Sequence, residues 1–442
     1  MEQEDRPKKL FARLPFYYGW VVVAVAFITI AVGVSVRTSF SLLFPPILSE
    51  FGWSRAETAG IFSVGFATSM VISPFLGVAI NRVGPGIVMA TGSFIVAGSL
   101  MLTTASDSQF LMYLSLGSGV VGGSIIFAFV SHGYLMPFWF VRRRGLATGL
   151  AFSGAGLGSM VLFPWLQEII QDDGWREACW AMAVILLVLV LPLNLLLQRR
   201  RPEDLGLQPD GDGRKPSAEE TGPKIDPVVD HEWASRDWSL KEAMATARFW
   251  WLGLGLFFGM YVWYAVQVHQ TQYLGEIGYS EVVAAYALGL VGLVGVIGQI
   301  GVGSLSDRIG REWAWTLSIS GFVLCYGCLL LMRQHQSETL LWAMVAVQGA
   351  LGYGLSATFG SIIAELFHSR RFGQIFGALG IIISFGSAFG PWLTGALYDW
   401  TGNYDLAWYV ALGACGLSAL GMWMAAPRRV RLASGVAKRR AR

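Results

Sequence analysis

The chain has 442 residues, of which 54% are hydrophobic and only 14% are charged. An ordinary soluble protein has roughly 25% charged residues, and a soluble chain of this length needs enough of them to cover several cores. The composition therefore excludes most soluble folds and indicates an integral membrane protein. Its 54 glycines and 18 tryptophans agree with this, because membrane helices use Gly at close contacts and Trp at the headgroup level.

Twelve apolar runs are long enough to cross a bilayer, whose hydrocarbon core of about 30 Å needs roughly 20 helical residues. The first run is too long for one perpendicular crossing, so we expect its end beyond Pro45-Pro46 to bend or to leave the membrane. The runs cover approximately 16–48, 57–80, 86–106, 109–139, 144–170, 177–198, 249–275, 282–305, 313–332, 339–366, 373–398 and 405–426.

Lys and Arg are distributed unevenly over the loops between these runs. Of the 32, 28 lie on the side that holds the N-terminus, three lie on the opposite side, and Arg37 lies within the first run. Because cytoplasmic loops have the excess of positive charge, we expect both termini in the cytoplasm. The expected location is the cell membrane, which in a bacterium is the inner membrane, with multiple crossings surrounded by membrane lipid.

The long hydrophilic stretch 199–248 divides the runs six and six. Its composition cannot bury a core, but Ser239-Leu-Lys-Glu242 has the spacing of a capping box before a short amphipathic helix. Basic residues beside membrane helices indicate topology and lipid rather than nucleic acid. The predicted regions are a cytoplasmic tail 1–15, a six-helix half 16–198, a cytoplasmic linker 199–248, a second six-helix half 249–426 and a basic cytoplasmic tail 427–442.

The two halves repeat each other in the same orientation. A parallel repeat of six-helix units is typical of transporters that open a central site alternately to each side of the membrane. At an offset of 226 residues, Phe51-Gly52-Trp53-Ser54 aligns with Ile277-Gly278-Tyr279-Ser280, and Gly77-x-x-x-Asn81-Arg82-x-Gly84 aligns with Gly303-x-x-x-Asp307-Arg308-x-Gly310.

The second copy of this loop, which continues to Arg311, resembles the signature loop of the major facilitator superfamily. The resemblance covers the whole chain and implies an all-α membrane protein with twelve transmembrane helices in two six-helix pseudo-symmetric halves, the major facilitator fold. It also implies that both loops latch the cytoplasmic ends of the halves. The first copy departs from the pattern, because Asn81 replaces the acid and Pro85-Gly86 stand where basic residues usually follow.

Two further segments resemble the bacterial branch related to monocarboxylate transporters and oxalate:formate exchangers. They are Tyr18-Gly19-Trp20 and the stretch from Phe138 to Gly149. The animal carriers of monocarboxylates have an Asp and an Arg in span eight where this chain has Gly295 and Gln299, and a span-one lysine at Thr38, next to Arg37. Animal-type lactate handling is therefore not implied.

Arg37 is the one Lys or Arg well inside a run, and every Asp and Glu falls in a loop, a tail or the last turn of a helix. A charge at mid-bilayer depth costs several kcal/mol unless it faces a wet cavity or a partner. A guanidinium binds a carboxylate through two parallel hydrogen bonds, so Arg37 predicts an anion site. The alternative is that Arg37 lies high enough in the span to reach water.

His269 lies at a similar depth in the first run of the second half, within an unusually polar stretch. Histidine exchanges a proton near neutral pH, so His269 is expected either to couple proton and substrate or to donate a hydrogen bond to a carboxylate. His132 is a second candidate for proton coupling, although a packing role is the alternative. The substrate site is predicted to consist of Arg37, His269, Gln270, Gln299 and Tyr264.

Glycine pairs in spans five and eleven predict close helix contacts. They are Gly145 with Gly149, Gly154 with Gly158, and Gly386 with Gly390. No nucleophile triad, metal cluster or phosphate loop is recognisable, so neither an enzyme nor a cofactor is expected.

The sequence thus predicts a monomeric secondary active transporter of small organic anions, working by alternating access with protons as co-substrate. The alternatives are an anion exchanger of the oxalate:formate type and an efflux pump for acidic metabolites or drugs. A non-transporting sensor that signals through its tail is a third alternative.

Overall fold

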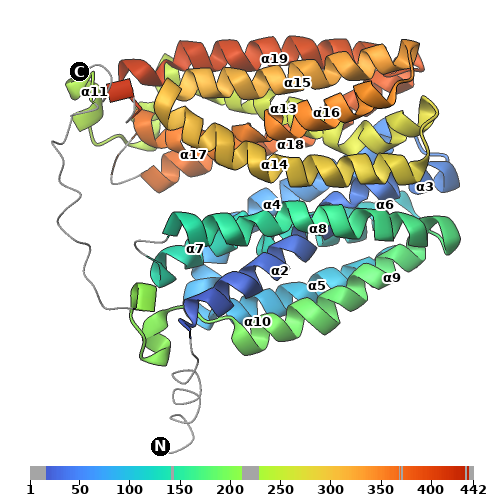
Figure 1. Ribbon diagram of the computed structural model, residues 1–442, viewed down its shortest axis with the longest axis horizontal. Coiled ribbons are helices and arrows are strands. Elements are labelled where there is room, and N and C mark those ends of the chain that lie inside the picture. Colours follow the sequence, from blue (N-terminus) through green and yellow to red (C-terminus); the bar gives the residue numbers. More distant parts are fainter. Residues whose placement is uncertain are drawn as a thin grey trace, which may run out of the picture. The chain divides into compact units, whose positions relative to one another are not determined.

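The computed structural model describes residues 16–140, 144–211, 228–367, 369, 372–433 and 436–437. The predicted tail 1–15, residues 141–143, part of the linker and the last basic residues lie outside this part of the chain, as do the side chains of Asn81 and Arg144 and the surroundings of Gly77 and Gly145. Twelve of the described helices are long and apolar enough to cross a membrane, which confirms the predicted number (Figure 1).

Most spans are single helices, and a few are built from consecutive helical segments. The membrane helices and their segments are α2 (Gly19–Thr38), α3 (Phe40–Phe51), α4 (Arg55–Val83), α5 (Pro85–Thr104), α6 (Gln109–Met112), η1 (Tyr113–Gly122), η2 (Gly123–Phe127), α7 (Phe129–Trp139), α8 (Arg144–Asp172), α9 (Trp175–Ile185), η3 (Leu186–Val190), α10 (Leu191–Leu197), α13 (Ala247–Glu276), α14 (Glu281–Ile309), α15 (Arg311–Gln334), α16 (Glu338–Ala350), η7 (Gly352–Gly354), α17 (Leu355–Leu366), α18 (Phe372–Thr401) and α19 (Asp405–Ala425).

The first apolar run consists of α2 and α3, which are separated only by Ser39, and the helix continues past both prolines to Phe51. Pro45 and Pro46 both lie inside α3. Because Pro45 has no N–H, the carbonyl of Ser41 loses its helical partner. That carbonyl accepts a hydrogen bond from the hydroxyl of Thr271 instead, which joins α3 to α13.

The described chain divides into two compact units. Unit 1 comprises Met1–Ser39 and Val71–Gly222, and unit 2 comprises Phe40–Met70 and Pro223–Arg442. Helix α3 and the first part of α4 therefore belong to unit 2, together with the whole second half of the chain.

In unit 1, α2 packs closely against α8. A Cβ at Gly154 would lie 2.2 Å from the carbonyl oxygen of Phe27, and one at Gly158 would lie 2.4 Å from that of Ala31. Only glycine permits this separation, so the predicted contact at this pair is present. The neighbouring prediction at Gly149 is wrong within the described residues, because a Cβ there would meet nothing within 4 Å.

Unit 2 repeats the same pairing between its corresponding helices, α13 and α18. A Cβ at Gly386 would lie 2.2 Å from the carbonyl oxygen of Phe257, and one at Gly390 would lie 2.6 Å from that of Tyr261. The first and fifth helices of each half thus pack backbone to backbone, which is the structural expression of the internal repeat.

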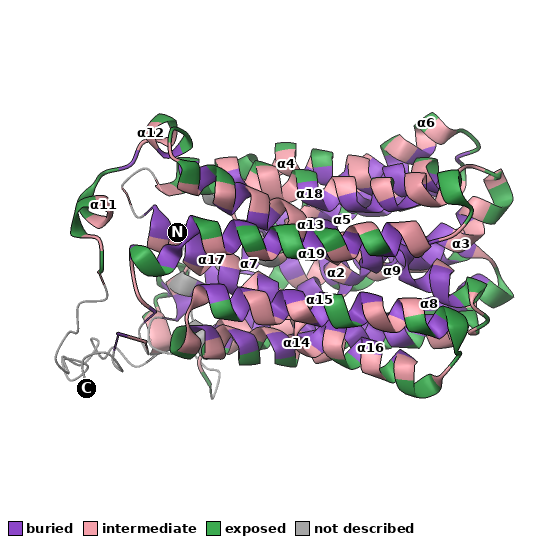
Figure 2. Ribbon diagram, turned by 90° about the horizontal axis from the view of Figure 1, so that it is seen from above, coloured by how far each residue is buried: buried purple, intermediate pink, exposed green. Residues whose placement is uncertain are grey.

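Several helices have a buried face and an exposed apolar face. Figure 2 shows exposed and buried residues alternating around α19 and α15. The exposed residues of α19 include Tyr409, Leu417, Leu420 and Met424. Apolar faces of this kind are stable in lipid and costly in water, so they agree with the twelve apolar spans.

The end of the linker forms α11 (His231–Ser235) and α12 (Leu240–Met244). The predicted capping box is present at α12, because Ser239 Oγ accepts from the N–H of Glu242 and Glu242 Oε2 accepts from the N–H of Ser239. The hydrogen bonds from Ser239, followed by one from Arg236, lower the pKa of Glu242 to about 2.

Replacement of Gly386 by Ala is expected to destabilise the protein by about 1–3 kcal/mol, because the added methyl group would force α18 away from the Phe257 carbonyl. The measurement is the unfolding midpoint in detergent micelles. Gly380→Ala in the same helix is the matched control, since a Cβ there would meet nothing within 4 Å. Equal midpoints for the two variants would contradict the close packing of α13 and α18.

Candidate functional site

Helix α13 has a run of buried polar side chains, which we name the α13 polar face: Gln267, His269, Gln270 and Thr271. They are only 4, 0, 0 and 6% exposed, respectively. At about 3.6 residues per turn, His269 points to the side opposite the other three. Buried polar groups in a membrane helix are costly unless they are hydrogen-bonded or face a ligand. The partners of each one therefore show what the face can do.

Gln267 is fixed by hydrogen bonds with its surroundings in unit 2. Its Oε1 accepts from the Tyr353 hydroxyl at 2.7 Å, and its carbonyl oxygen accepts from Ser41 Oγ at 2.6 Å. The ring of Tyr353 in turn lies against Trp263, with 4.3 Å between centroids. This part of the face is therefore a neutral, preorganised hydrogen-bonding group beside two aromatic rings.

The ring of Tyr353 also packs against Gly295, the position at which the animal carriers of monocarboxylates have an Asp. A Cβ at Gly295 would lie 2.4 Å from Cδ1 of the Tyr353 ring. The tyrosine thus fills the space that an Asp side chain would need. Gln299, one turn further along α14, is half-buried. Its neutral amide stands where the animal carriers have a positively charged Arg.

Gln270 differs from Gln267, although both are amides on the same helix. Its Nε2 and Oε1 are both buried, and neither has a hydrogen-bond partner among the described residues. An unsatisfied buried amide costs about 1–3 kcal/mol. Such an amide is a candidate ligand-binding group, because a ligand can supply the missing donor and acceptor.

Tyr264 lies one helical turn before Val268, among the aromatic rings of α4. Its ring is 4.6 Å from Phe66 and 6.0 Å from Phe62, measured between centroids. Phe62 stacks in turn on Phe40 of α3, at 5.3 Å. The predicted site residue Tyr264 therefore belongs to an apolar, aromatic wall in unit 2.

His269 is hydrogen-bonded through both ring nitrogens. Nε2 lies 2.9 Å from the carbonyl oxygen of Pro391 and Nδ1 lies 3.0 Å from the Tyr404 hydroxyl. A carbonyl oxygen can only accept, so Nε2 must hold a proton and Nδ1 of the neutral ring accepts from Tyr404. The tautomer of His269 is thus determined by its neighbours.

Tyr404 connects His269 to a buried arginine that the sequence prediction did not include. Arg55, the first residue of α4, donates from Nη1 to the Tyr404 hydroxyl at 2.8 Å and forms an ion pair with Glu276. Its guanidinium lies over the ring of Tyr398, 3.6 Å from the centroid, and Arg55 is 8% exposed. A directed chain of hydrogen bonds therefore runs from Arg55 through Tyr404 and His269 to Pro391.

Asp399, near the end of α18, holds the start of α4 in place. Its two carboxylate oxygens accept from the backbone N–H groups of Arg55 and Ala56, at 2.9 and 2.8 Å. The first N–H groups of a helix have no partner within the helix, and a carboxylate at that end is stabilised by the helix dipole. The start of α4 is thus capped by another helix of the same unit.

Two of the residues predicted for substrate binding or proton coupling lie in unit 1. Arg37 is half-buried in the last turn of α2. His132, on α7, is fully buried, and its Nδ1 lies 3.4 Å from the carbonyl oxygen of Ala128. Neither unit contains, among the residues described, a group of three or more His, Cys, Asp or Glu side chains placed to hold a metal ion.

The sequence model of the Major Facilitator Superfamily matches residues 21–359. The chain belongs to the major facilitator superfamily. It is 27% identical to "Monocarboxylate transporter 13" of Rattus norvegicus over 93% of this chain and 89% of that protein. It is 30% identical to "Monocarboxylate transporter 11" of Homo sapiens, over 93% of this chain and 83% of that protein. This is a family of membrane transporters and not of enzymes.

A solved structure confirms the major facilitator fold. The bacterial homologue of the human lysosomal transporter Spinster, in its inward-facing and unoccupied conformation, has a TM-score of 0.63 with this chain. The two sequences are 17% identical, and the alignment covers 96% of this chain and 97% of that one.

The signature loop of this superfamily member is built around Arg311. Its guanidinium contacts Glu365 Oε1 at 2.8 Å, Asp307 Oδ1 at 2.8 Å and Ser306 Oγ at 2.9 Å. Gly310, with φ +102°, makes the turn between α14 and α15. Arg308 is exposed. Gly303, at the start of the loop, packs closely against Ala357, since a Cβ added at Gly303 would lie 3.2 Å from the Cβ of Ala357.

The first copy of the loop has the same turn but fewer charges. Gly84 has φ +90° and Arg82 is exposed. Pro85 begins α5 at the place where Arg311 begins α15. The surroundings of Gly77 and the side chain of Asn81 lie outside the described part, so the role of both residues in the latch stays a prediction.

Sequence reasoning did not identify Arg55, Glu276, Asp399, Tyr404 or Tyr353. A usable signal was present for Arg55, which is one of only three basic residues assigned by sequence to the external side. Its pairing with acids at the ends of α13 and α18 depends on the fold and has no local sequence pattern.

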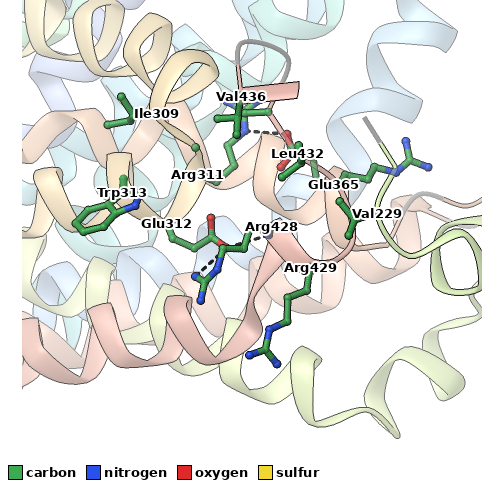
Figure 3. Close-up of a pocket in the computed structure, with 13 residues that line it drawn as sticks. Val229, Ile309, Arg311, Glu312, Trp313, Glu365, Arg428, Arg429, Leu432 and Val436 are labelled. Carbon is green, nitrogen blue, oxygen red and sulfur yellow. Dashed lines mark hydrogen bonds and ion pairs between the residues drawn. The ribbon is translucent and has the colours of Figure 1, made fainter. Parts of the chain in front are cut away.

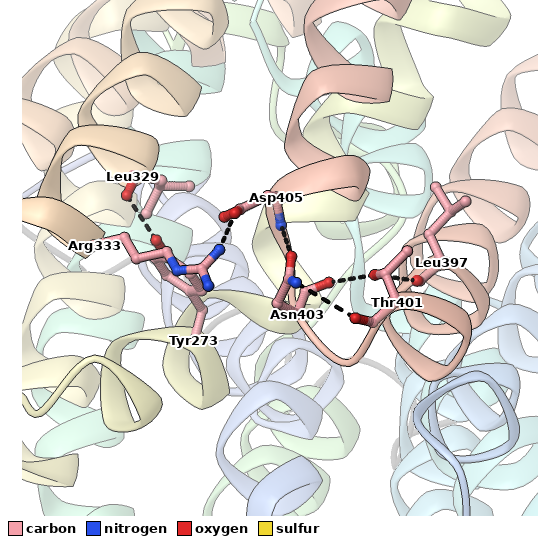
Figure 4. Close-up of polar contacts among 7 residues, drawn as sticks. All are labelled: Tyr273, Leu329, Arg333, Leu397, Thr401, Asn403 and Asp405. Atoms are coloured by element: carbon pink, nitrogen blue, oxygen red, sulfur yellow. Dashed lines mark hydrogen bonds and ion pairs between the residues drawn. The ribbon is translucent and has the colours of Figure 1, made fainter.

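Arg55→Gln is expected to lower the free energy of unfolding by about 3 kcal/mol, at the low end for a broken buried pair because the Glu276 side chain is 28% exposed. The measurement is chemical unfolding in detergent micelles. The matched control is Arg333→Gln, because Arg333 forms an ion pair with Asp405 (Figure 4) whose side chains are 43% and 37% exposed. An exposed pair contributes about 0–1 kcal/mol, so equal effects would contradict a special role for Arg55.

Proposed function

We propose that this transporter moves small monocarboxylates across the membrane by alternating access. Membership of the superfamily and the relation to proteins named monocarboxylate transporters support the substrate class. The observation that carries the proposal is Gln270, a buried amide with no hydrogen-bond partner among the described residues. A carboxylate with a polar substituent has the acceptors and donors that such an amide needs.

We assign the binding of the carboxylate to Arg37. It is the only Lys or Arg well inside a span of the sequence, and it lies half-buried at the end of α2. A guanidinium binds a carboxylate with two charge-assisted hydrogen bonds, and these are about twice as strong as neutral ones.

The α13 polar face and the aromatic wall suit the remainder of the substrate. Gln270, together with Gln299, supplies neutral hydrogen-bonding groups, and Tyr264 with Phe66 supplies an apolar surface. Arg37 is the one permanently cationic side chain assigned to the substrate, which matches a single carboxylate. The proposed substrate is therefore a monocarboxylate with an apolar or aromatic body and a polar substituent for Gln270.

We propose the proton as co-substrate and His269 as the group that couples it. Protonation would place an N–H on Nδ1, opposite the Tyr404 hydroxyl that now donates to it. The hydroxyl would have to turn, which disturbs its contact with Arg55. His132 remains the second candidate, and exchange of one anion for another, as in oxalate:formate exchange, or efflux of acidic metabolites remains the alternative to proton symport.

The chain from Arg55 to Pro391 is proposed to close the external end of unit 2, and the Arg311 loop to hold the cytoplasmic end. This orientation follows the distribution of Lys and Arg, which places both termini in the cytoplasm. The proposed location is the cell membrane, the inner membrane in a bacterium, and the proposed functional form is a monomer.

Arg37→Gln is expected to reduce uptake of a carboxylate about a hundredfold or more, because two charge-assisted hydrogen bonds are lost. Arg37→Lys is expected to retain part of the uptake, since it keeps the charge but not the two-pronged geometry. The measurement is uptake into proteoliposomes of those carboxylates that raise the unfolding midpoint of the wild-type protein. Arg333→Gln is the control. Wild-type uptake by Arg37→Gln would refute the assignment.

Gln270→Leu is expected to raise stability and to weaken substrate binding about tenfold. The apolar side chain removes an unsatisfied amide from the empty protein but cannot bind the substrate. Gln267→Leu is the control and should lower stability, because it removes the acceptor of the Tyr353 hydroxyl. Unfolding midpoints with and without substrate measure both effects. A loss of stability in Gln270→Leu without any change in binding would show that the amide is structural.

A further inference from the structure

A cavity of about 450 Å³ lies at the signature-loop end of unit 2 (Figure 3). Its wall combines the turn between α14 and α15, the end of α17, and the segment that follows α19. Its charged lining residues are Arg311, Glu312, Glu365, Arg428, Arg429 and Arg431.

The charges on the wall do not balance. Arg311 is paired with Glu365, and Arg428 with Glu312, at 2.8 and 3.5 Å. Arg429 and Arg431 form no ion pair with any described residue. The lining therefore has a net positive charge, which attracts an anion.

Two polar atoms on the wall have no hydrogen-bond partner among the residues described. They are Nε of Arg431, a donor, and Oε2 of Glu365, an acceptor, and both are buried. Because Oε1 of Glu365 already accepts from Arg311, the second oxygen is available to a ligand. A matching ligand has an anionic acceptor for the arginines and a donor for the glutamate.

The cavity wall is held together by backbone contacts. The segment after α19 pairs with the linker, since the N–H of Val229 donates to the carbonyl of Val430 at 2.9 Å and Val228 forms a bridge with Arg431. The N–H of Arg428 donates to Glu312 Oε1 at 2.9 Å. Both sides of the cavity are thus anchored, and the arginines are presented from a fixed backbone.

We propose that this cavity binds a phosphate ester whose alcohol part has a hydroxyl group. The phosphate contacts Arg431, whose buried Nε has no partner among the described residues, and the hydroxyl donates to Oε2 of Glu365. The exposed Arg429 adds positive charge to the wall. Arginine suits phosphate because of its planar fork of donors. The volume is within the usual range of about 300–1,000 Å³ for small-molecule sites.

Two sources share this chemistry: a soluble phosphate ester and the headgroup of an anionic phospholipid. The position of the cavity suits the headgroup, because the arginines follow α19 at the predicted cytoplasmic surface, where anionic lipids gather. The proposal concerns a site separate from substrate transport and does not depend on the transported substrate.

The test measures binding to the purified full-length protein with two soluble probes, inorganic phosphate and glycerol 3-phosphate, by calorimetry. Unfolding midpoints are measured in parallel in phosphatidylcholine vesicles with and without phosphatidylglycerol. Binding of soluble probes identifies a soluble ester as a sufficient ligand, and stabilisation by phosphatidylglycerol alone identifies a lipid headgroup. Either result supports the site, and the absence of both overturns it.

The variants locate the site. The double variant Arg429→Gln with Arg431→Gln is expected to weaken binding about tenfold or more. Arg236→Gln is the matched control, since Arg236 is an exposed arginine outside the cavity. Equal binding by the double variant and the wild type would overturn the proposal.

Glu365→Gln tests the second half of the ligand. It is expected to weaken glycerol 3-phosphate, which has hydroxyl donors, more than inorganic phosphate, which is held through the arginines. If both probes weaken equally, the hydroxyl contact is wrong. The double variant remains an independent test should this change disturb Arg311.

Discussion

The burial of Arg55 is the constraint on which the predicted external end of unit 2 depends. A guanidinium that is 8% exposed needs compensation for the water it has lost. Glu276 supplies the opposite charge, and Tyr404 supplies an acceptor. Because the Tyr404 hydroxyl accepts from Arg55, its own proton is directed to His269, and the tautomer of the histidine follows. One buried charge thus orders side chains of α13 and the side chain of Tyr404, the residue before α19.

The same ordering distinguishes the members of the α13 polar face. Gln267, His269 and Thr271 have partners within unit 2, while the Gln270 amide has none among the described residues. On α14, the ring of Tyr353 fills the space beside Gly295, where a Cβ would lie 2.4 Å from Cδ1 of the ring. The change at Gly295 and the presence of Tyr353 are therefore physically linked.

The sequence was sufficient for features that depend on local composition. Apolar runs predicted the twelve spans, the Gly386 and Gly390 pair predicted a close contact, and Ser239 with Glu242 predicted the capping box. The two prolines of the first run do not end its helix, and the Ser41 carbonyl, which loses its helical partner at Pro45, accepts a hydrogen bond from Thr271. Contacts such as Arg55 with Glu276 join residues 221 positions apart. Their formation depends on which helices become neighbours, and no spacing rule in a single sequence contains that information.

The two copies of the signature loop make the same backbone turn but are stabilised by different interactions. Gly84 and Gly310 both adopt positive φ, at +90° and +102°, so the chain turns in the same way in both halves. After the turn, Arg311 is held by ion pairs, whereas Pro85 has neither a charge nor an N–H. The following glycine in the first half instead packs closely, since a Cβ at Gly86 would lie 2.8 Å from the carbonyl oxygen of Asn194.

This difference makes the two loops sensitive to different conditions. Salt weakens ion pairs that reach solvent, such as the pair between Arg311 and the half-exposed Asp307. The close packing of α5 on α10 does not depend on ionic strength. The charged loop also adjoins the arginine-lined cavity, through Arg311, Glu312 and Glu365. An anion bound there would act on the second half of the repeat and leave the packed joint of the first half unaffected. The asymmetry of the repeat thus makes the described signature loop of unit 2 more sensitive to ionic strength than the turn at Gly84 and Pro85 in unit 1.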